Sequence, residues 1–517
     1  MDPSPVHPPS RHQPRLPANM SAFHTPSASP LARTPVPDSA RSFLRRWVRT
    51  SLSALWLCQP VSAVTVDWTQ GPGGVSVAAD GTGNAYTVRY EYNPAGDIRL
   101  VKHNAQGDLL WDVTYDQTDP TKWDRAESVS CDPQGNAIVC GTLMSGYSSP
   151  VRAASILMKF SANGNLLWRQ VFDGAFDGSS TRKCLSDGDG NIYVFGLGMG
   201  PSGLVTRVKS FAPDGTVRWD WFDSAGIGAP LHFKFTADRA LLMTCRSVTG
   251  SLNGYAKVDL QGNTLWSLAA ISSIAAGDAA GDVSGNTYLV HGTTLNGGGT
   301  MLRKLDAQGT QIWSVTHPFG GFRVEVGTDD QPVACGFSQP ASGSAAFVKF
   351  DTAGNVIWQN LNADGNQTLL LHAQLLLDSQ NNAYLAAGLL TSMAVCKVNH
   401  DGSHGWLSAA GMGSSASAMA LGPDGKVFIT GGETLQLGQP WTPRLPSLDV
   451  SPNQPSPRIS LVAEPGRIYR IEFADDLGDW QPACTMLMHG PKQGFIDTDA
   501  AAISRRFYRA VGVDGPP

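Results

Sequence analysis

The sequence predicts an all-β fold, a β-propeller of four-stranded blades followed by a small β-sandwich-like domain. One phrase occurs seven times: a short apolar strand, a turn residue that is usually Asp or Asn, two residues, Gly, three residues and Trp. A second phrase, Asp, two residues, Gly-Asn and a strand, alternates with it. The composition, with 56 Gly, 34 Pro and 16% charged residues, favours short strands and tight turns over long helices.

Residues 1–63 form a leader with a composition of its own. They hold seven Arg, two Asp and neither Glu nor Lys, and their many Pro and Ser residues predict a disordered segment. The basic stretch RSFLRRWVRT then precedes a short apolar run ending in small residues, which resembles a secretory signal cleaved after Ala63. We therefore expect a secreted, periplasmic or cell-surface protein. The alternatives are a start at Met20, a twin-Arg signal at Arg45-Arg46 and lipid attachment at Cys58.

The Trp residues of the first phrase recur at the period of propeller blades. Their successive intervals are 57, 51, 47, 47, 45 and 48 residues. Each phrase reads as a hairpin, because the turn Asp accepts backbone hydrogen bonds and Gly adopts the positive φ of the turn. Two hairpins per period give the four strands of one blade. We expect the Trp side chains to fill the space between blades rather than to bind a ligand. They are Trp111, Trp168, Trp219, Trp266, Trp313, Trp358 and Trp406.

The ends of the repeat array decide the number of blades. Seven full units run from about Val75 to Ser408, and a half unit follows at 417–432. A strand that ends in Trp68 precedes the first unit. If this strand completes the half unit as its outer strand, the ring closes with eight blades and leaves no unpaired edge at the seam. Seven blades, with the half unit packed as an extension, is the alternative.

These repeats resemble the SBBP-type β-propeller repeats of secreted bacterial proteins, over about residues 64–435. KLDAQGTQIW at 304–313, KFDTAGNVIW at 349–358 and DVSGNTYLVHG at 282–292 carry the resemblance. It implies a propeller without a shared catalytic motif. The phrase is also similar to the Trp-docking repeats of quinoprotein dehydrogenases, but it lacks their Thr before Gly and the chain has no Cys-Cys pair. We therefore expect no cofactor.

The chain after the repeats changes composition twice. Residues 438–457 are rich in Pro and predict an extended linker between the propeller of residues 64–437 and a last domain. Residues 458–513 contain five short strand-like segments, which predict a small β-sandwich-like domain. Its phrases resemble C-terminal modules of secreted bacterial proteins, such as RIYRIEFA from Arg467 and RRFYR from Arg505.

Charge and cysteine content exclude several classes of function. Without residues 1–63, 31 basic and 41 acidic residues remain, a net charge of −10, which disfavours nucleic acid as a partner. No run of 18 apolar residues follows residue 64, so we do not expect an integral membrane protein. We also expect the protein to be a monomer. Seven cysteines remain, and none forms a CxxC motif, so we expect small core residues rather than disulfides or metal ligands.

No catalytic or metal motif stands out from the repeats. Asp187 and Asp189 have the spacing of a calcium loop, but the same phrase elsewhere is a plain turn. His400 and His404 flank a repeat turn, which disfavours zinc binding. The longest insertions between strands are residues 114–128 and 144–155. We expect them to contact a ligand, because binding sites of propellers tend to lie in the loops at the ends of the channel. The candidate contact residues in them are Lys122, Trp123, Arg125, Tyr147 and Arg152.

Taken together, these features predict a secreted, non-catalytic binding or scaffold protein for a polymer or protein ligand. An extracellular enzyme of lyase or hydrolase type, with its site at the channel mouth, is the alternative. Clustered His, Arg and carboxylate groups in the channel would favour the enzyme, and small apolar and amide groups would favour binding.

Overall fold

A computed structural model describes most of the chain from Val64 to Val513. The described residues are 64–91, 97–115, 123–144, 153–176, 180–201, 203–247, 252–272, 277–292, 299–338, 344–364, 370–389, 392–410, 416–439, 444–451, 456–503 and 505–513. Within these ranges, no helix has the length and apolarity needed to cross a membrane.

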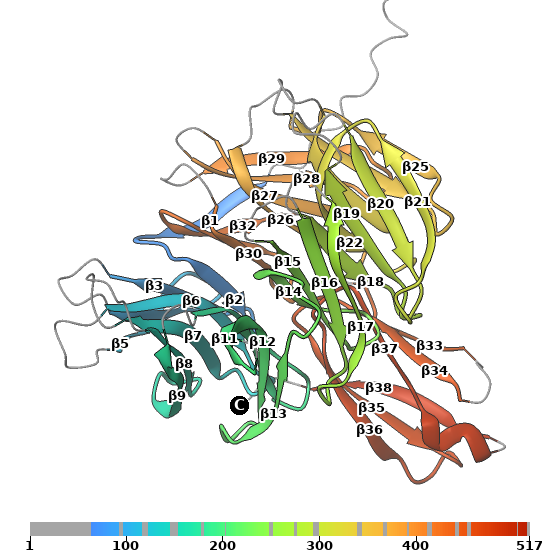
Figure 1. Cartoon of the computed structure of the whole chain (residues 1–517), viewed down its shortest axis with the longest axis horizontal. Coiled ribbons are helices and arrows are strands. Elements are labelled where there is room, and N and C mark those ends of the chain that lie inside the picture. Colours follow the sequence, from blue (N-terminus) through green and yellow to red (C-terminus); the bar gives the residue numbers. More distant parts are fainter. Residues whose placement is uncertain are drawn as a thin grey trace, which may run out of the picture. The chain divides into compact units, whose positions relative to one another are not determined.

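Eight four-stranded antiparallel sheets form the blades of a propeller, and the colours of Figure 1 follow them in sequence order. The first blade holds β2 (Ser76–Ala79), β3 (Ala85–Tyr90), β4 (Ile98–His103) and β5 (Leu109–Tyr115). The second holds β6 (Trp123–Cys131), β7 (Ala137–Met144), β8 (Ala153–Phe160) and β9 (Leu166–Phe176). The third holds β10 (Ser180–Ser186), β11 (Ile192–Gly200), β12 (Gly203–Phe211) and β13 (Val217–Phe222). The fourth holds β14 (Ala229–Phe235), β15 (Leu241–Arg246), β16 (Leu252–Val258) and β17 (Thr264–Ser272).

The second half of the ring continues the same order. The fifth blade holds β18 (Asp278–Gly281), β19 (Thr287–Gly292), β20 (Thr300–Leu305) and β21 (Gln311–His317). The sixth holds β22 (Gly320–Val326), β23 (Pro332–Phe337), β24 (Ala345–Phe350) and β25 (Val356–Asn360). The seventh holds β26 (Leu370–Leu377), β27 (Ala383–Gly388), β28 (Met393–Val398) and β29 (His404–Ala410).

The eighth blade joins the two ends of the repeat array. It holds β30 (Ala418–Leu421), β31 (Val427–Thr430), β32 (Thr434–Gly438) and, as its outer strand, β1 (Thr65–Gln70). β1 pairs antiparallel with β32, and β30 contacts β2 of the first blade. The ring therefore has eight blades and closes through the N-terminal strand, as the sequence predicted.

Seven of the eight Trp residues, all except Trp406, lie against the turn of the next blade. The indole N–H of Trp111 donates to the carbonyl of Ala162 at 2.8 Å, and Trp219 donates to Leu260 at 3.0 Å. The Gly of that next turn has a positive φ, and a Cβ on Gly262 would lie 2.8 Å from the ring of Trp219. Trp68 of β1 is 8% exposed and meets Gly107 of the first blade in the same way. The contact between Trp and a turn Gly thus also occurs where the last and first blades meet.

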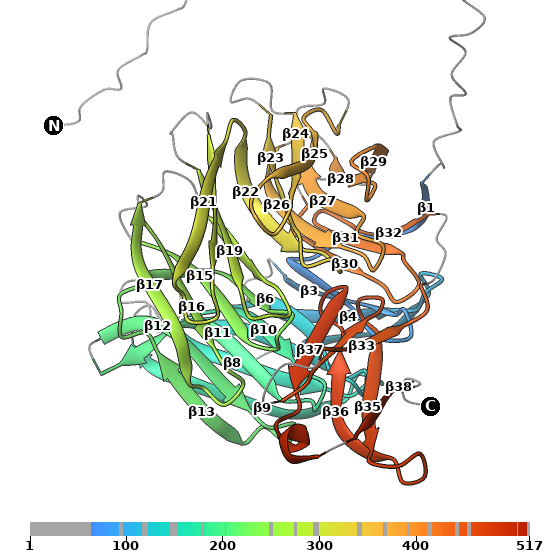
Figure 2. The same ribbon diagram turned by 90° about the vertical axis from the view of Figure 1, so that its right-hand side faces the viewer.

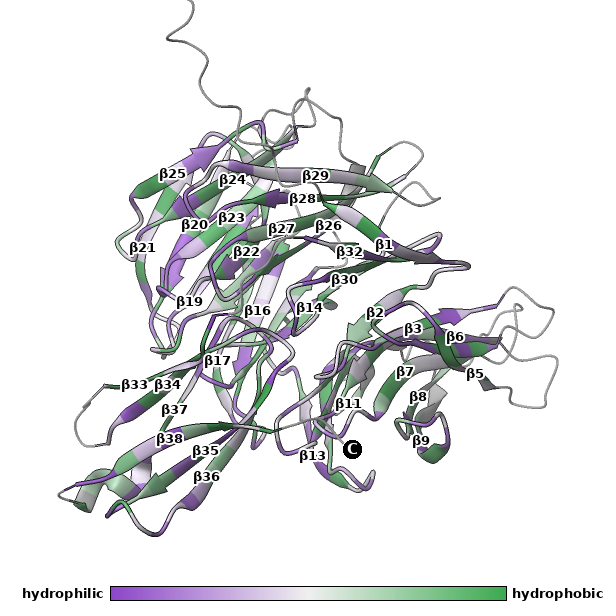
Figure 3. Ribbon diagram, turned by 180° about the vertical axis from the view of Figure 1, so that it is seen from behind, coloured by the Kyte–Doolittle hydropathy of each residue, from purple (hydrophilic) through white to green (hydrophobic). Residues whose placement is uncertain are grey.

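The hydrophobic core lies between the blades. Both faces of the second and third strands of most blades are buried, and Figure 3 shows hydrophobic residues on the strands of every blade. A fully buried Tyr packs against the Trp of its own blade in alternate blades, with ring centroids 5.8 Å apart for Tyr86 and Trp111. Because the core consists of repeated blade contacts, most aromatic residues of the repeats are used in packing.

The C-terminal strands form two three-stranded sheets that face a common core. One sheet has the order β33 (Ser447–Ser451), β34 (Arg458–Val462) and β37 (Lys492–Ile496). The other has the order β36 (Gln481–Leu487), β35 (Ile468–Ala474) and β38 (Phe507–Gly512), and a 3-10 helix η1 (Thr498–Ala502) precedes β38. We call residues 444–513 the C-terminal module; Figure 2 shows its strands in red.

One strand of the module lies where the sequence predicted a linker. β33 falls within residues 438–457 and pairs along its whole length with β34. Its Leu448 packs against the module core. The many Pro residues around it pointed to an extended segment without partners, but SLDVS carries the alternating pattern of an edge strand.

Candidate binding site in the central channel

The innermost strands of all eight blades line a cavity of about 530 Å³ along the central channel. Residues of the C-terminal module, between Pro465 and Gln493, line the same cavity. The volume falls within the range of about 300–1,000 Å³ that is usual for small-molecule sites.

Two rings of side chains face the channel because strand residues two apart point to the same side. The proximal ring holds the residues two positions before the inner turn of each blade. Its members are Ala78, Ser130, Leu185, Lys234, Ala280, Glu325, Leu376 and Ala420. The distal ring holds the residues four positions before that turn. Its members are Ser76, Ser128, Lys183, His232, Asp278, Arg323, Gln374 and Ala418. The residues between the two rings, such as Cys184 and Phe233, are buried within the blades.

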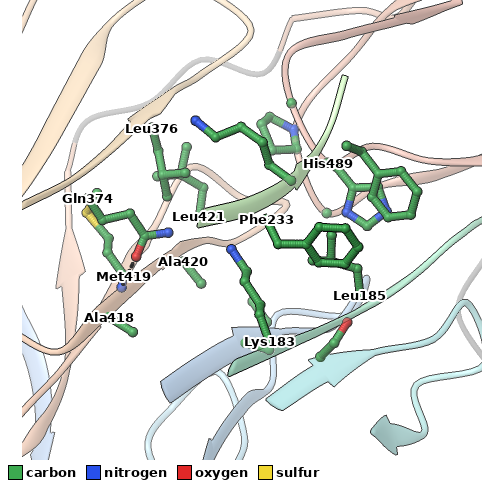
Figure 4. A pocket seen from close by; sticks show the side chains of 18 of the residues that line it. Lys183, Leu185, Phe233, Gln374, Leu376, Ala418, Met419, Ala420, Leu421 and His489 are labelled. Atoms are coloured by element: carbon green, nitrogen blue, oxygen red, sulfur yellow. Dashed lines mark hydrogen bonds between the residues drawn. The ribbon is translucent and has the colours of Figure 1, made fainter. Parts of the chain in front are cut away.

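Charge is confined to one half of the two rings. Blades three to six contribute every charged member, whereas the other four blades contribute Gln374 and small or aliphatic side chains. Figure 4 shows Gln374, Leu376 and Ala418 on one side of the cavity and Lys183 on another. Within the two rings, a wall of charged side chains therefore faces a wall of uncharged ones.

Lys234 is the central cation of the charged wall. Its Nζ lies 3.0 Å from Oδ2 of Asp278 and 2.7 Å from Oε1 of Glu325. The pKa of the Lys234 amine is raised, because the favourable interaction with these two carboxylates outweighs the burial that would lower it. The pKa of the Glu325 carboxyl is raised by burial, which Lys234 offsets in part. Lys234 thus has its counter-charges within the protein.

Lys183 and His232 are adjacent members of the distal ring without such partners. Neither side chain makes an ion pair or hydrogen bond with any residue that the structure describes. Burial lowers the pKa of the Lys183 amine, and nearby Lys234 lowers it further. Burial also lowers the pKa of His232 to about 3, with Arg323 adding to the effect. His232 is therefore a neutral imidazole at physiological pH.

The C-terminal module forms the floor of the cavity. The His489 ring stacks on Phe235 of β14 at a centroid distance of 4.2 Å. The backbone N–H of Gly494 donates to the Ala237 carbonyl at 2.8 Å, and Lys492 pairs with Asp330 at 2.6 Å. Further contacts reach the inner turns of other blades, including Arg458 to Ser284 and Arg444 to Ser379. The module therefore covers the end of the channel where these turns lie, on the side of the proximal ring.

The candidate contact residues of the two insertions are described only in part. Lys122, Tyr147 and Arg152 lie outside the described residues, as does the side chain of Trp123, whose backbone begins β6. Arg125 is exposed on β6, and its Nε lies 2.9 Å from Oε1 of Glu127, which lines the cavity. Arg125 thus contacts a residue that lines the channel. Ligand contact by the five candidate residues stays a prediction.

Other residues that the sequence singled out have structural partners. The Asp187 carboxylate accepts hydrogen bonds from Asp189, Asn191 and Tyr193 within its own hairpin. His404 Nδ1 lies 2.8 Å from the Ala363 carbonyl. All seven cysteines of the described chain are free, and six of them are buried. No group of three or more metal-ligating side chains occurs in the described ranges.

Neither ring of the channel was predicted from the sequence. Their signal lies in the second phrase, two and four residues before the turn. In four blades these positions hold small, aliphatic or amide residues, but blades three to six place Lys, His, Asp, Arg and Glu there. A buried strand register that repeats with small side chains and then changes to charged ones indicates a functional wall.

The fold and the channel together define a β-propeller whose central cavity is covered at one end by the C-terminal module. No known family model matches the sequence, and no curated protein matches it. Similar solved structures include the Dos1 propeller, with a TM-score of 0.47, 9% identity and coverage of 73% of this chain and 95% of that one. Sqt1 from Chaetomium thermophilum has a TM-score of 0.45, 10% identity and coverage of 73% and 100%. YCF48 bound to D1 peptide has a TM-score of 0.41, 14% identity and coverage of 74% and 97%.

Proposed function

We propose that this chain is an exported β-propeller binding protein that acts at the cell surface or outside the cell. The ligand is the end of a polymer or protein, or a small molecule, held in the central channel. The observation that carries the proposal is the cavity of about 530 Å³, with a charged wall, an uncharged wall and a floor made by the C-terminal module. The basic and apolar leader before Val64 supports export.

Several narrower statements belong to the same proposal. We infer membership of the SBBP-type secreted bacterial propellers from the repeat phrase. The proposed domain limits are 1–63 for the leader, 64–437 for the propeller and 458–513 for the last domain, to which β33 within residues 438–457 adds a strand. The insertions at 114–128 and 144–155 are proposed to contact the parts of a ligand that extend beyond the channel.

A variant that fills the channel tests the proposal. Ala420→Trp places an indole side chain in the channel at a position of the proximal ring. Ala409→Trp places the same side chain at an exposed position of β29. Both variants and the native chain are applied to an array of neutral and acidic oligosaccharides and short peptides. We expect the native chain and Ala409→Trp to retain the same probes, and Ala420→Trp to lose them. Retention by all three proteins would place binding outside the channel.

A lyase-type enzyme is the second candidate, and His232 favours it. A neutral imidazole can accept a proton, and Arg323 in the same ring can stabilise the negative charge that develops on the substrate. Incubation of the native chain with each retained oligosaccharide separates the candidates. The binding proposal predicts unchanged substrate by mass spectrometry. Cleavage that is lost in His232→Gln would establish the enzyme.

A further inference from the structure

The channel holds one cation whose counter-charge the described chain does not supply. In the two rings, Lys183, Lys234 and Arg323 face only two carboxylates, Asp278 and Glu325. Both carboxylates lie within 3.0 Å of Lys234. Lys183 has no hydrogen-bond or ion-pair partner within the described residues. An ammonium group held in a recess without a partner is costly, so its presence indicates a ligand that completes the pair.

The surroundings of Lys183 suit the rest of such a ligand. Its neighbours in the distal ring are Ser128 and His232, which offer a hydroxyl and a neutral imidazole. Across the channel, Gln374 accepts a hydrogen bond from the Met419 backbone N–H at 2.9 Å through its side-chain oxygen (Figure 4). That bond orients the amide and leaves its NH₂ group as a donor. Ala418 and Ala420 beside it leave room for an uncharged body.

The two rings of the channel carry a net charge opposite in sign to that of the whole chain. The chain carries a formal net charge of −5, yet the two rings hold one more cation than carboxylate. The extra cation of the two rings attracts a small anion, while the acidic outer surface repels bulk polyanions. This arrangement favours one anionic group at a defined place over general attraction to acidic polymers.

We propose that Lys183 binds the anionic group, a carboxylate or a phosphate monoester, of a ligand whose uncharged, hydroxyl-bearing body lies toward Gln374, Ala418 and Ala420. This inference rests on the proposed function, because it assigns the chemistry of the ligand in the same channel. His232 and Ser128 act as neutral hydrogen-bond partners beside the ammonium group.

The test compares acids with their neutral counterpart on the full-length chain. Glucuronate supplies the carboxylate, glucose 6-phosphate the phosphate, and glucose the uncharged body; acetate and inorganic phosphate supply the anion alone. Binding is measured by calorimetric titration at constant ionic strength. We expect glucuronate or glucose 6-phosphate to bind more tightly than glucose and than the bare anions, and the tighter of the two identifies the anionic group.

Three variants assign the effect to Lys183. Lys183→Met is expected to weaken binding of the preferred acid by about tenfold or more, the usual loss for a charge-assisted bond. Lys183→Arg should retain binding within about threefold, because it keeps the charge. Arg470→Gln removes one positive charge from a side chain that is 48% exposed on β35, and it should bind as the native chain does.

The folding of the variant gives an independent readout. Lys183→Met removes a half-buried charge that lacks a partner within the described residues, so it should raise the melting temperature while it lowers acid binding. A variant that is less stable than the native chain would show that Lys183 has a structural partner and would overturn the proposal.

Other outcomes are equally decisive. Equal binding of the acids by the native chain and Lys183→Met, or no binding of any acid by the native chain, overturns the anion assignment. Binding by the bare anions alone overturns the assignment of the uncharged body. If Ala420→Trp loses array ligands while Lys183→Met keeps them, the channel is the site and only the anion assignment fails.

Discussion

Gly262 shows how one residue meets two requirements of the blade contact. Its φ is +91°, and a Cβ there would lie 2.8 Å from the Trp219 ring. Gly226 has a φ of +74° and no atom within 4 Å of such a Cβ. Both positions impose the left-handed backbone, but only Gly262 packs against a ring.

Alanine at these two positions separates backbone strain from ring packing. We expect Gly226→Ala to lower the free energy of unfolding by about 1–2 kcal/mol, the cost of the left-handed backbone. Gly262→Ala should lower it by roughly 2–4 kcal/mol, because the Trp219 ring must also shift. Chemical denaturation of both variants measures the difference. Equal losses would show that the Trp contact is not needed at the turn.

The imidazole of His489 makes stability depend on pH. Burial lowers its pKa to about 4, and its Nε2 has no hydrogen-bond partner among the described residues. Asp187, Lys183 and Arg239 are the charged groups that act on it. The unfolded chain, with a histidine pKa of about 6.5, binds the proton first as the pH falls. Stability is therefore fully present above about pH 6.5 and decreases toward pH 4.

His489→Phe tests this dependence, since it keeps a ring against Phe235 but cannot bind a proton. We expect a shallower loss of melting temperature between pH 6.5 and pH 4 than in the native chain. His232 and His291, whose pKa values burial lowers to about 3 and about 4, contribute to the slope that remains, as do His103 and His317, whose pKa values burial also lowers. An unchanged slope would show that His489 already carries its proton in the folded chain.

At the scale of elements, β1 closes the ring. It pairs only with β32, and its Trp68 fills the contact between the last and first blades. A chain that begins at Gly71 lacks this strand, whereas a chain that begins at Val64 keeps it. We expect the shorter chain to lose about 3–5 kcal/mol of unfolding free energy, the usual cost of removing a buried Trp. Equal denaturation midpoints for the two chains would contradict closure through β1.

The sequence predicted most of the strands and blades, but it did not predict the residues that line the channel. The Trp phrase repeats in seven blades, so its spacing predicted a propeller, and the strand before Trp68 favoured eight blades over the alternative of seven. β33 was missed because five residues between prolines give a weak strand signal. The channel rings were missed because Lys183 and Asp278 stand in different blades, far apart in the sequence. Only the ring geometry brings such residues to one wall.

At the scale of the whole molecule, the C-terminal module depends on close contact with the propeller. A Cβ on Gly188 of the third blade would lie 2.2 Å from the Thr485 carbonyl oxygen. Gly81 holds the same repeat position in the first blade, and its Cβ would lie 3.6 Å from the nearest module atom, in Gly466. The module thus leaves room for a Cβ atom at position 81 of the first blade but not at position 188 of the third blade.

Alanine at these matched positions tests the docking of the module. We expect Gly188→Ala to increase amide hydrogen exchange in the segment 485–491, because the backbone there must move away. Gly81→Ala should exchange as the native chain does, since its Cβ reaches ordinary contact distance. Hydrogen exchange with mass spectrometry resolves this segment. Equal protection in both variants would show that the module is held elsewhere.

The central claim is that the channel, closed by the module at one end, holds a ligand. Its most direct test is titration of glucuronate and glucose 6-phosphate into the native chain, Ala420→Trp and Ala409→Trp. The account predicts saturable binding to the native chain and to Ala409→Trp, and loss of that binding in Ala420→Trp. Undiminished binding to Ala420→Trp would contradict it.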